Sequence, residues 1–511
     1  MVFSSAIFLF VFFPTVFILY NILPSLKAKN LLLTAASLVF YSFGQPKYLL
    51  LLLTSVVINY ISGVLLCGSL TRRKTVLAVA VILNLGMISI FKYLDFALTN
   101  VNAIFRTAIP LPGIVLPIGI SFFTFQGMSY VIDVYRDKNM GTKSFGKLLL
   151  YISFFPQLIA GPIVKYHDVA AMIDDRKCTA EMTAKGLRRF IIGLSKKLLF
   201  ANAMGAIADQ VFSMTADGLD ARIAWIGAVC YSLQIYYDFS GYSDMAIGMG
   251  KIFGFTFLEN FDHPYTASTI QDFWRRWHIS LSSWFRDYLY IPLGGSYCSK
   301  GRAAFNKIVV FFTTGLWHGA NWTFIVWGMW HGMFQMLETF NIIPGKKLQG
   351  RLIGHIYTLM VVMLGFVLFR AETFSQAGLI FANMFTGFTF TPETDQILHD
   401  ILTNYNIFMI IASMILCVDW LKIIRKKTGM ADERAMEGDI IENGKIIKTA
   451  GFYGDREAIA DADEAAAGKL RSPKMIIALE AVSYVAVFVL FIYNLLNLSQ
   501  ATFNPFIYFQ F

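Results

Sequence analysis

His318 is the residue of this sequence whose type and surroundings most favour acid–base chemistry. It lies in TTGLWHGANWTFIVWGMWHG, where nearly all neighbours are apolar or aromatic. A charge at membrane depth is costly, so we expect a neutral imidazole that accepts a proton near neutral pH. Asn321, at i+3, would share a helical face with His318, and Trp317 would form an aromatic wall. The alternative is a histidine that only hydrogen-bonds between helices.

A second histidine, His278, lies in DFWRRWHISLSSWFRDYLY, which combines charges with large aromatic side chains. The charges prevent this segment from crossing a bilayer, and the aromatics keep it at the interface. It therefore predicts an interfacial helix at or just below the cytoplasmic surface. On that helix Asp272 would pair with Arg275 or Arg276, and His278 would stack with Trp274. The alternative is an aromatic-belt helix anchored by arginines.

Further polar residues interrupt the apolar stretch YSLQIYYDFSGYSDMAIGMG. Carboxylates buried at membrane depth need partners, and Arg275 or Arg276 would supply them. Glycines in the same stretch indicate close helix packing. Gln126, in SFFTFQGMSY, is a weaker case of the same kind. The candidate residues of the stretch are Gln234, Tyr237, Asp238, Ser240 and Asp244.

The elements that position these residues must be membrane helices. Of 511 residues, 56% are hydrophobic and only 15% are charged, which indicates an integral membrane protein. The apolar runs reach about 20 residues, the length of a spanning helix. The net charge of +10 is concentrated in short loops, as topology requires, so no nucleic-acid partner is expected. The five cysteines have no paired spacing, and no metal site or disulfide framework is predicted.

The sequence predicts an all-α polytopic membrane protein with ten to thirteen membrane helices. The first apolar run, 2–23, precedes Lys27 and Lys29, which places the N-terminus outside. The segment KLLLYISFFPQLIAGPIVK is broken by prolines and followed by another basic loop, so we expect a re-entrant hairpin. The alternative is a kinked ordinary span.

Three regions are predicted along the chain. The membrane core covers 1–422 and includes a catalytic region at 222–341. A polar cytoplasmic loop, partly disordered, covers 423–474, because this stretch has no apolar face for a second core. A C-terminal membrane helix and tail cover 475–511.

The stretches QIYYDFSGYSDMAIG, DFWRRWHISLSSWFRDYLYIPLGG and GLWHGANWTFIVWG, in this order, resemble the membrane-bound O-acyltransferase family. IPLGG and the closing PFIYFQF are similar to its alginate and peptidoglycan O-acetyltransferase branch. The resemblance implies a ring of membrane helices, with re-entrant and interfacial helices, around a channel where two funnels meet. It also implies that His318, in the WHG motif, is the catalytic histidine and that His278, in the RWH motif, supports it.

The resemblance further implies acyl transfer from a cytoplasmic thioester, expected to be acetyl-CoA or an acyl carrier. His318 would be the general base toward an acceptor hydroxyl arriving from outside. No bound cofactor is required, and an extracytoplasmic partner of the SGNH-hydrolase type would modify alginate, peptidoglycan or another surface polymer. The expected location is the bacterial cytoplasmic membrane. Two rival functions remain at this point: D-alanyl transfer to teichoic acid from a carrier protein, and a transporter or flippase.

Overall fold

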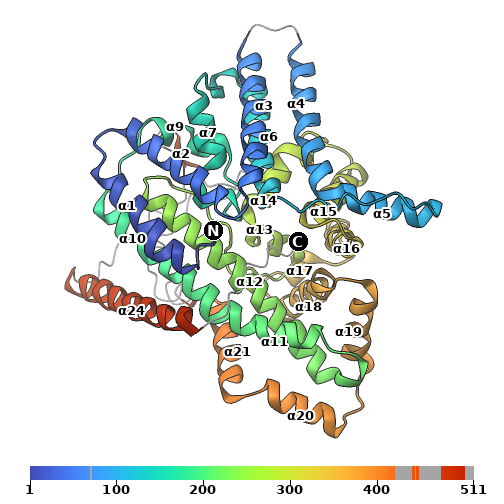
Figure 1. Ribbon diagram of the computed structural model, residues 1–511. Coiled ribbons are helices and arrows are strands. Elements are labelled where there is room, and N and C mark those ends of the chain that lie inside the picture. Colours follow the sequence, from blue (N-terminus) through green and yellow to red (C-terminus); the bar gives the residue numbers. More distant parts are fainter. Residues whose placement is uncertain (69–71, 421–439, 443–444, 448–472, 501–511) are drawn as a thin grey trace.

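The computed structural model describes residues 1–68, 72–420, 440–442, 445–447 and 473–500. Helices form nearly all of this part of the chain, and they gather around the long α12 (Ala221–Ile252), which crosses the middle of the molecule (Figure 1). The helices before it are η1 (Phe8–Phe12), α1 (Phe13–Ile22), α2 (Leu26–Ser42), η2 (Pro46–Tyr48), α3 (Leu49–Cys67), α4 (Arg73–Ile88), η3 (Ser89–Tyr93), α5 (Leu94–Phe105), α6 (Ile120–Arg136), η4 (Lys138–Met140), α7 (Phe145–Ser153), α8 (Phe155–Leu158), α9 (Tyr166–Asp174), α10 (Ala180–Ser195), η5 (Lys196–Ala201), α11 (Asn202–Phe212) and η6 (Ala216–Gly218).

Both candidate histidines lie in the part of the chain that follows α12. The helices of this part are η7 (Pro264–Thr266), α13 (Ile270–Arg276), α14 (Ile279–Phe285), η8 (Arg286–Tyr290), α15 (Lys300–His318), α16 (Trp322–Thr339), α17 (Gly345–Leu348), α18 (Leu352–Arg370), α19 (Phe374–Thr386), α20 (Pro392–Ile401), α21 (Asn404–Leu416) and α24 (Pro473–Gln500).

Glycines bring α10 and α12 into close contact, as the sequence predicted for this region. A Cβ atom added to Gly193 would lie 2.5 Å from the carbonyl oxygen of Gly241. A Cβ atom added to Gly248 would lie 2.6 Å from the carbonyl oxygen of Gly186. Side chains at these positions would push the helices apart, so the glycines set the distance between α10 and α12.

The prediction of an all-α polytopic membrane protein is confirmed, but with fewer long apolar helices than expected. Among the described residues, five helices are long and apolar enough to cross a membrane, or six if the bent pair α20 and α21 counts as one span. The five are Pro46–Cys67, Arg73–Phe105, Ala180–Phe212, Leu352–Arg370 and Ala481–Leu498. Several predicted spans are shorter or more polar, and among these α6 and α12 are mostly buried.

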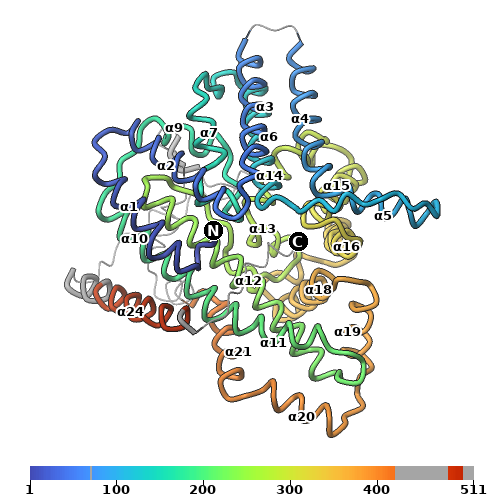
Figure 2. Tube along the Cα trace, viewed as in Figure 1, coloured from blue at the N-terminus to red at the C-terminus, as the bar shows by residue number. Residues whose placement is uncertain are grey.

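Apolar side chains cover the outer faces of these spans. Leu50 on α3 is 72% exposed, and Ile82 on α4 and Val482 on α24 are each 67% exposed. Such a surface is stable only against lipid tails. α4 continues through η3 into α5, which projects from the body of the molecule (Figure 2).

The segment predicted to be re-entrant consists of two short helices followed by an irregular stretch. α7 has 9 residues and α8 has 4, too few for either to cross a bilayer. Every residue from 151 to 166 is buried. Irregular backbone at membrane depth is tolerated when protein surrounds it, so these features support the re-entrant interpretation.

The polar loop predicted at 423–474 lies mostly outside the described residues. Within it, β1 (Ile440–Glu442) and β2 (Lys445–Ile447) pair antiparallel, with Ile441 opposite Ile446.

Candidate active site

His318 is the last residue of α15, and the chain reverses directly after it. Gly319 has an extended backbone, and a Cβ atom there would lie 2.2 Å from the ring of Phe324. A Cβ atom on Gly315 would lie 2.4 Å from the Phe324 carbonyl oxygen. The small residues of WHG and of the preceding turn therefore allow α16 to fold back tightly against α15.

The expected pairing of Asn321 with His318 on one helical face is wrong. Asn321 is the N-cap of α16: its Oδ1 accepts from the Thr323 amide at 3.2 Å, and its Nδ2 donates to the Glu372 carbonyl at 2.8 Å. The i+3 relationship requires a continuous helix, and the break at Gly319 removes it. Asn321 thus stabilises the turn after His318.

Aromatic rings enclose the His318 imidazole. His318 is 5% exposed, and its ring lies edge-on to those of Trp317, Trp327 and Phe369, with centroid distances of 4.9, 5.0 and 5.1 Å. The low-polarity surroundings penalise an imidazolium ion. The predicted wall of Trp317 is present, and Trp327 and Phe369 complete it.

His278 lies between two short helices rather than within one. α13 ends at Arg276, and His278 is the N-cap of α14 with a left-handed backbone, φ +45°. The predicted stacking on Trp274 along one helix is therefore wrong. The ring is 1% exposed and lies edge-on to Phe239 of α12 at 4.5 Å.

Asn260 fixes the His278 ring. Its Oδ1 lies 3.2 Å from Nδ1 of His278 and also accepts from the Ser280 amide and hydroxyl, at 3.1 and 2.9 Å. Its Nδ2 donates to Ser243 of α12 at 2.9 Å. Ser280 in turn accepts from the amide of Ile163, in the re-entrant segment, at 3.0 Å. One amide side chain thus connects the histidine to α12 and the re-entrant segment.

The two histidines converge on Trp317. Its ring lies 5.9 Å from that of His278 and 4.9 Å from that of His318, centroid to centroid. A cavity of about 80 Å³ adjoins Trp317 and His318 and is also lined by Lys92, by residues 116–122 and by Ile159 of the re-entrant segment. The predicted pair therefore lies in one buried region beside a small cavity.

The acidic residues of α12 form ion pairs with different partners from those predicted. Asp238 forms an ion pair with Lys197, and Asp244 with Arg189 at 2.8 Å and Lys196 at 2.6 Å. The expected partners, Arg275 and Arg276, were therefore wrong. The cations come from α10 and η5, which pack along α12.

The other polar residues of α12 also face its helix neighbours. Tyr237 donates to the Ser413 carbonyl at 2.6 Å, and Gln234 packs against Gly205 of α11. Ser240 is buried, at 2% exposure. The contacts of Tyr237 and Gln234 indicate helix packing, away from the two histidines.

The interfacial segment keeps one predicted ion pair. Asp272 accepts from Arg276 at 3.0 Å, four residues on. Trp274 is buried, and its ring lies edge-on to those of Trp327 and His331 at 5.9 and 5.2 Å. Trp274 therefore extends the aromatic enclosure from Trp327, and it contacts the site through that residue.

Gln126 is fully buried on α6 beside the interfacial helix. Neither polar atom of its side chain has a hydrogen-bond partner among the described residues. Its neighbour Phe125 stacks on Trp284 at 3.8 Å and accepts at its carbonyl from the Trp284 indole at 3.0 Å. The sequence correctly placed Gln126 in the interior.

Lys92 is a site residue that sequence reasoning missed. Its ammonium donates to the carbonyls of Trp317, at 2.5 Å, and His318, at 3.1 Å. The neighbouring Tyr93 hydroxyl donates to the Leu316 carbonyl at 2.5 Å. These groups satisfy carbonyls that the end of α15 leaves without helical partners. A lone lysine in the apolar run 75–97 was the signal that could have identified it.

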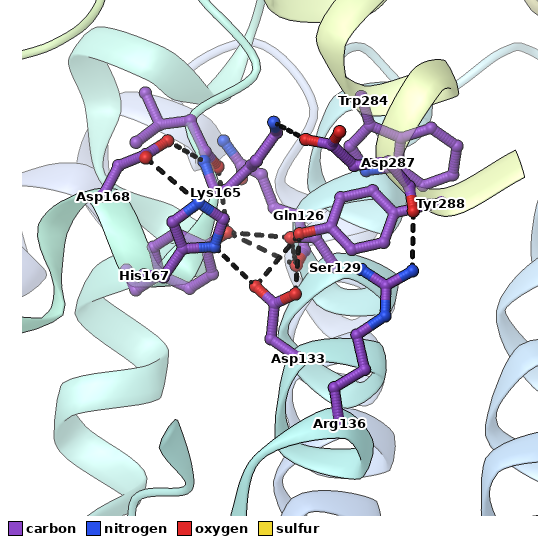
Figure 3. Close-up of polar contacts among 12 residues, drawn as sticks. Gln126, Ser129, Asp133, Arg136, Lys165, His167, Asp168, Trp284, Asp287 and Tyr288 are labelled. Carbon is purple, nitrogen blue, oxygen red and sulfur yellow. Dashed lines mark hydrogen bonds and ion pairs between the residues drawn. The ribbon is translucent and has the colours of Figure 1, made fainter. Parts of the chain in front are cut away.

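A polar cluster holds η8 to α6 and α9 (Figure 3). Asp133 of α6 lies 2.9 Å from Nδ1 of His167 and accepts from the Tyr288 hydroxyl at 2.9 Å. Asp168 lies 3.2 Å from Nε2 of the same histidine. Hydrogen bonds to Asp133 and then Asp168 raise the pKa of His167 to about 9. Lys165, at the start of α9, pairs with Asp287 of η8 at 2.5 Å.

Comparisons with known proteins identify the family of the chain. The family model of the membrane-bound O-acyltransferases matches residues 119–343, the part of the chain that includes both histidines. A probable alginate O-acetylase of Azotobacter vinelandii is 37% identical, with 100% of each chain covered. A peptidoglycan O-acetyltransferase of Helicobacter pylori is 36% identical over 74% of this chain and 78% of its own. A teichoic acid D-alanyltransferase of Bacillus subtilis is 27% identical over 50% of this chain and 69% of its own. The chain belongs to the membrane-bound O-acyltransferase family of membrane enzymes.

Proposed function

We propose that this enzyme transfers an acetyl group from a cytoplasmic thioester to a hydroxyl on the outer side, for O-acetylation of an extracytoplasmic polysaccharide. The observation that carries the proposal is the convergence of His278 and His318 on Trp317 beside a small cavity. The names of two relatives above 30% identity, an alginate O-acetylase and a peptidoglycan O-acetyltransferase, support acetyl as the group.

His318 is the general base of the proposed reaction. As the acceptor oxygen attacks the thioester carbonyl carbon, the imidazole takes the hydroxyl proton. The carbon–sulfur bond then breaks, and the proton passes to the departing thiolate. Positioned proton transfer of this kind contributes typically about 10² to 10⁴-fold to the rate. The buried, neutral imidazole at the end of α15 suits this role.

His278 supports the reaction as a hydrogen-bond acceptor. Because Asn260 Nδ2 donates to Ser243, its Oδ1 is the acceptor that faces His278. Nδ1 of His278 therefore carries the proton, and Nε2 keeps a lone pair with no hydrogen-bond partner among the described residues. An unprotonated Nε2 can accept a hydrogen bond from an N–H or O–H group of a substrate. It cannot donate one to an oxyanion.

Acetyl-CoA is the donor we propose, with an acyl carrier protein as the alternative. Lys300 and Arg302 are exposed at the start of α15, about 27 Å along the helix from His318 at 1.5 Å per residue. Cations at that end would attract CoA phosphates, and the positive-inside rule places them in the cytoplasm. The protein then lies in the bacterial cytoplasmic membrane with its N-terminus outside.

We also propose an extracytoplasmic partner of the SGNH-hydrolase type that passes the acetyl group to the polymer. The helical elements of the described chain form the membrane bundle and provide no soluble outer domain for that step. Alginate, peptidoglycan and other surface polymers are the candidate final acceptors.

The test uses the full-length protein in vesicles with labelled acetyl-CoA inside. We expect label to reach an outside acceptor, with free CoA retained inside, and His318→Ala to reduce transfer by at least about 100-fold. His399→Ala is the matched control, since the His399 side chain is 87% exposed. Unchanged transfer by His318→Ala would remove the assigned base. Preference for a D-alanyl carrier would favour the teichoic-acid reaction, and movement of an intact solute without acyl transfer would favour a transporter.

A further inference from the structure

A second cavity, here called the outer cavity, neighbours the inner cavity that adjoins His318, and Lys92 lines both. The outer cavity, of about 130 Å³, is lined by residues of η3 and α5, by Ile114 and by Ala320. The inner cavity, of about 80 Å³, reaches Trp317 and His318. Lys92 and Leu116 belong to the walls of both. A group that entered the outer cavity would therefore meet Lys92 on its way to His318.

Lys92 is held in place by the catalytic helix. Its hydrogen bonds to the Trp317 and His318 carbonyls fix the ammonium at the boundary between the cavities. An ammonium has three donors, and these contacts use two of them. A lysine at this boundary can thus offer one further hydrogen bond to a polar group that passes it.

Asp95, one helical turn after Lys92, lines the outer cavity only. Its Oδ2 accepts from the Ile114 amide at 3.1 Å. Its Oδ1 accepts no hydrogen bond from any described residue. A carboxylate with an unused acceptor oxygen, in a wall that also contains Lys92 and several apolar side chains, suits a small ligand that donates one hydrogen bond.

The cavity sizes limit what can enter. A cavity of about 150 Å³ holds one benzene molecule, so the outer cavity has room for a group of about that size. The inner cavity is smaller still. A hydroxyl carried on a short, narrow arm suits spaces of this size.

We propose that the outer cavity binds the acceptor as a primary alcohol, with Asp95 accepting its hydroxyl hydrogen bond before the hydroxyl passes Lys92 to reach His318. This inference rests on the proposed function. The group that the outer cavity would bind is a hydroxymethyl group. A serine side chain of a partner protein and the exocyclic carbon of a hexose both provide it. Asp95 binds the acceptor and takes no proton in the reaction.

The kinetic test compares Asp95→Asn with wild type. Asparagine keeps an oxygen for the Ile114 amide, so the local fold is preserved, but it loses the negative charge. Removing a charged hydrogen bond predicts a rise of roughly 10-fold in the acceptor KM, with the donor KM and kcat within about twofold of wild type. Asp217→Asn is the matched control, because Asp217 is exposed outside both cavities. An unchanged acceptor KM, or a fall in kcat alone, overturns the proposal.

A binding measurement separates this inference from the proposed function. Saturation-transfer NMR on the detergent-solubilised full chain would use N-acetyl-L-serinamide and methyl β-D-glucopyranoside, with N-acetyl-L-alaninamide as the probe that lacks a hydroxyl. We expect saturation of one hydroxymethyl probe, and the probe that responds identifies the source. The signal should fall by at least about fivefold in Asp95→Asn and persist in Asp217→Asn. Equal signals in both variants, or no signal from either hydroxymethyl probe, overturn the inference even if acetyl transfer is observed.

Discussion

Nδ1 of His278 lies 3.2 Å from Oδ1 of Asn260, and the other contacts of this amide decide the protonation of the ring. Its Nδ2 group donates to Ser243, so the oxygen must face the histidine. His278 therefore donates from Nδ1 and directs an unprotonated Nε2 elsewhere. The same oxygen accepts from the Ser280 amide, which joins the orientation of the ring to the start of α14.

Asn260→Ala should lower acetyl transfer by about 10 to 100-fold, because the His278 ring loses both its orientation and its preferred tautomer. The variant also leaves the buried Ser280 amide without its partner, at a cost of about 1–3 kcal/mol in the free energy of unfolding. Transfer in vesicles and thermal unfolding in detergent measure the two effects. Ser243→Ala is the control, since Asn260 keeps its bonds to His278 and Ser280. Equal activity losses in both variants would contradict a tautomer role.

The sequence predicted the residues of the site more successfully than their geometry. His278 and His318 were identified from their apolar and aromatic surroundings, and both are buried against Trp317. The i+3 placement of Asn321 failed because helical arithmetic holds only within one helix, and α15 ends at His318. The roles of the two histidines remain predictions.

Partners distant in sequence could not be predicted at all. Lys92 contacts the end of a helix 225 residues later, and no local spacing rule connects them. The same holds for Lys197 and Asp238, which come together because glycines bring α10 and α12 into contact. The sequence showed that buried carboxylates needed cations, but several cations were available.

Breaking the buried pair of Asp238 and Lys197 should destabilise the protein without altering the chemistry. Their side chains are 1% and 6% exposed, so Asp238→Leu leaves a buried lysine without this carboxylate, at a cost of about 3–5 kcal/mol. The double variant Asp238→Leu, Lys197→Met removes both charges and should recover most of that loss. Denaturant unfolding in detergent measures stability, and transfer per folded molecule should match wild type. Lower specific activity in the double variant would indicate a functional role for the pair.

Gly193→Ala should also destabilise the bundle, because its methyl group would lie 2.5 Å from the Gly241 carbonyl oxygen. Overpacking of this kind costs about 1–3 kcal/mol. Gly378→Ala is the matched control: Gly378 is an exposed glycine in α19, and a Cβ atom there meets nothing within 4 Å. The control should be neutral or gain up to about 1 kcal/mol, since alanine favours helix. Thermal unfolding of both variants gives the comparison, and equal losses would contradict a packing role for Gly193.

His167 should make the stability of the protein depend on alkaline pH. Its pKa is raised from 6.5 to about 9 by the carboxylates of Asp133 and Asp168, so the folded state binds this proton more tightly than the unfolded state. The resulting stabilisation is complete below about pH 6.5, declines above it, and is lost as the pH passes about 9.

His167→Gln should therefore lower the unfolding temperature in detergent at pH 6 and change it little at pH 10. The difference from wild type at each pH is the quantity to compare, because any other group that titrates over this range does so in both proteins. His399→Gln is the control, since that side chain is 87% exposed and its Nδ1 lies as far as 3.9 Å from the Asp400 carboxylate. The ion pair of His167 with Asp133 joins α9 to α6, and Asp133 also accepts from Tyr288 of η8. The loss of the imidazole should therefore be accompanied by faster proteolysis near residue 167. An equal temperature difference at pH 6 and pH 10 would show that His167 contributes packing and not charge.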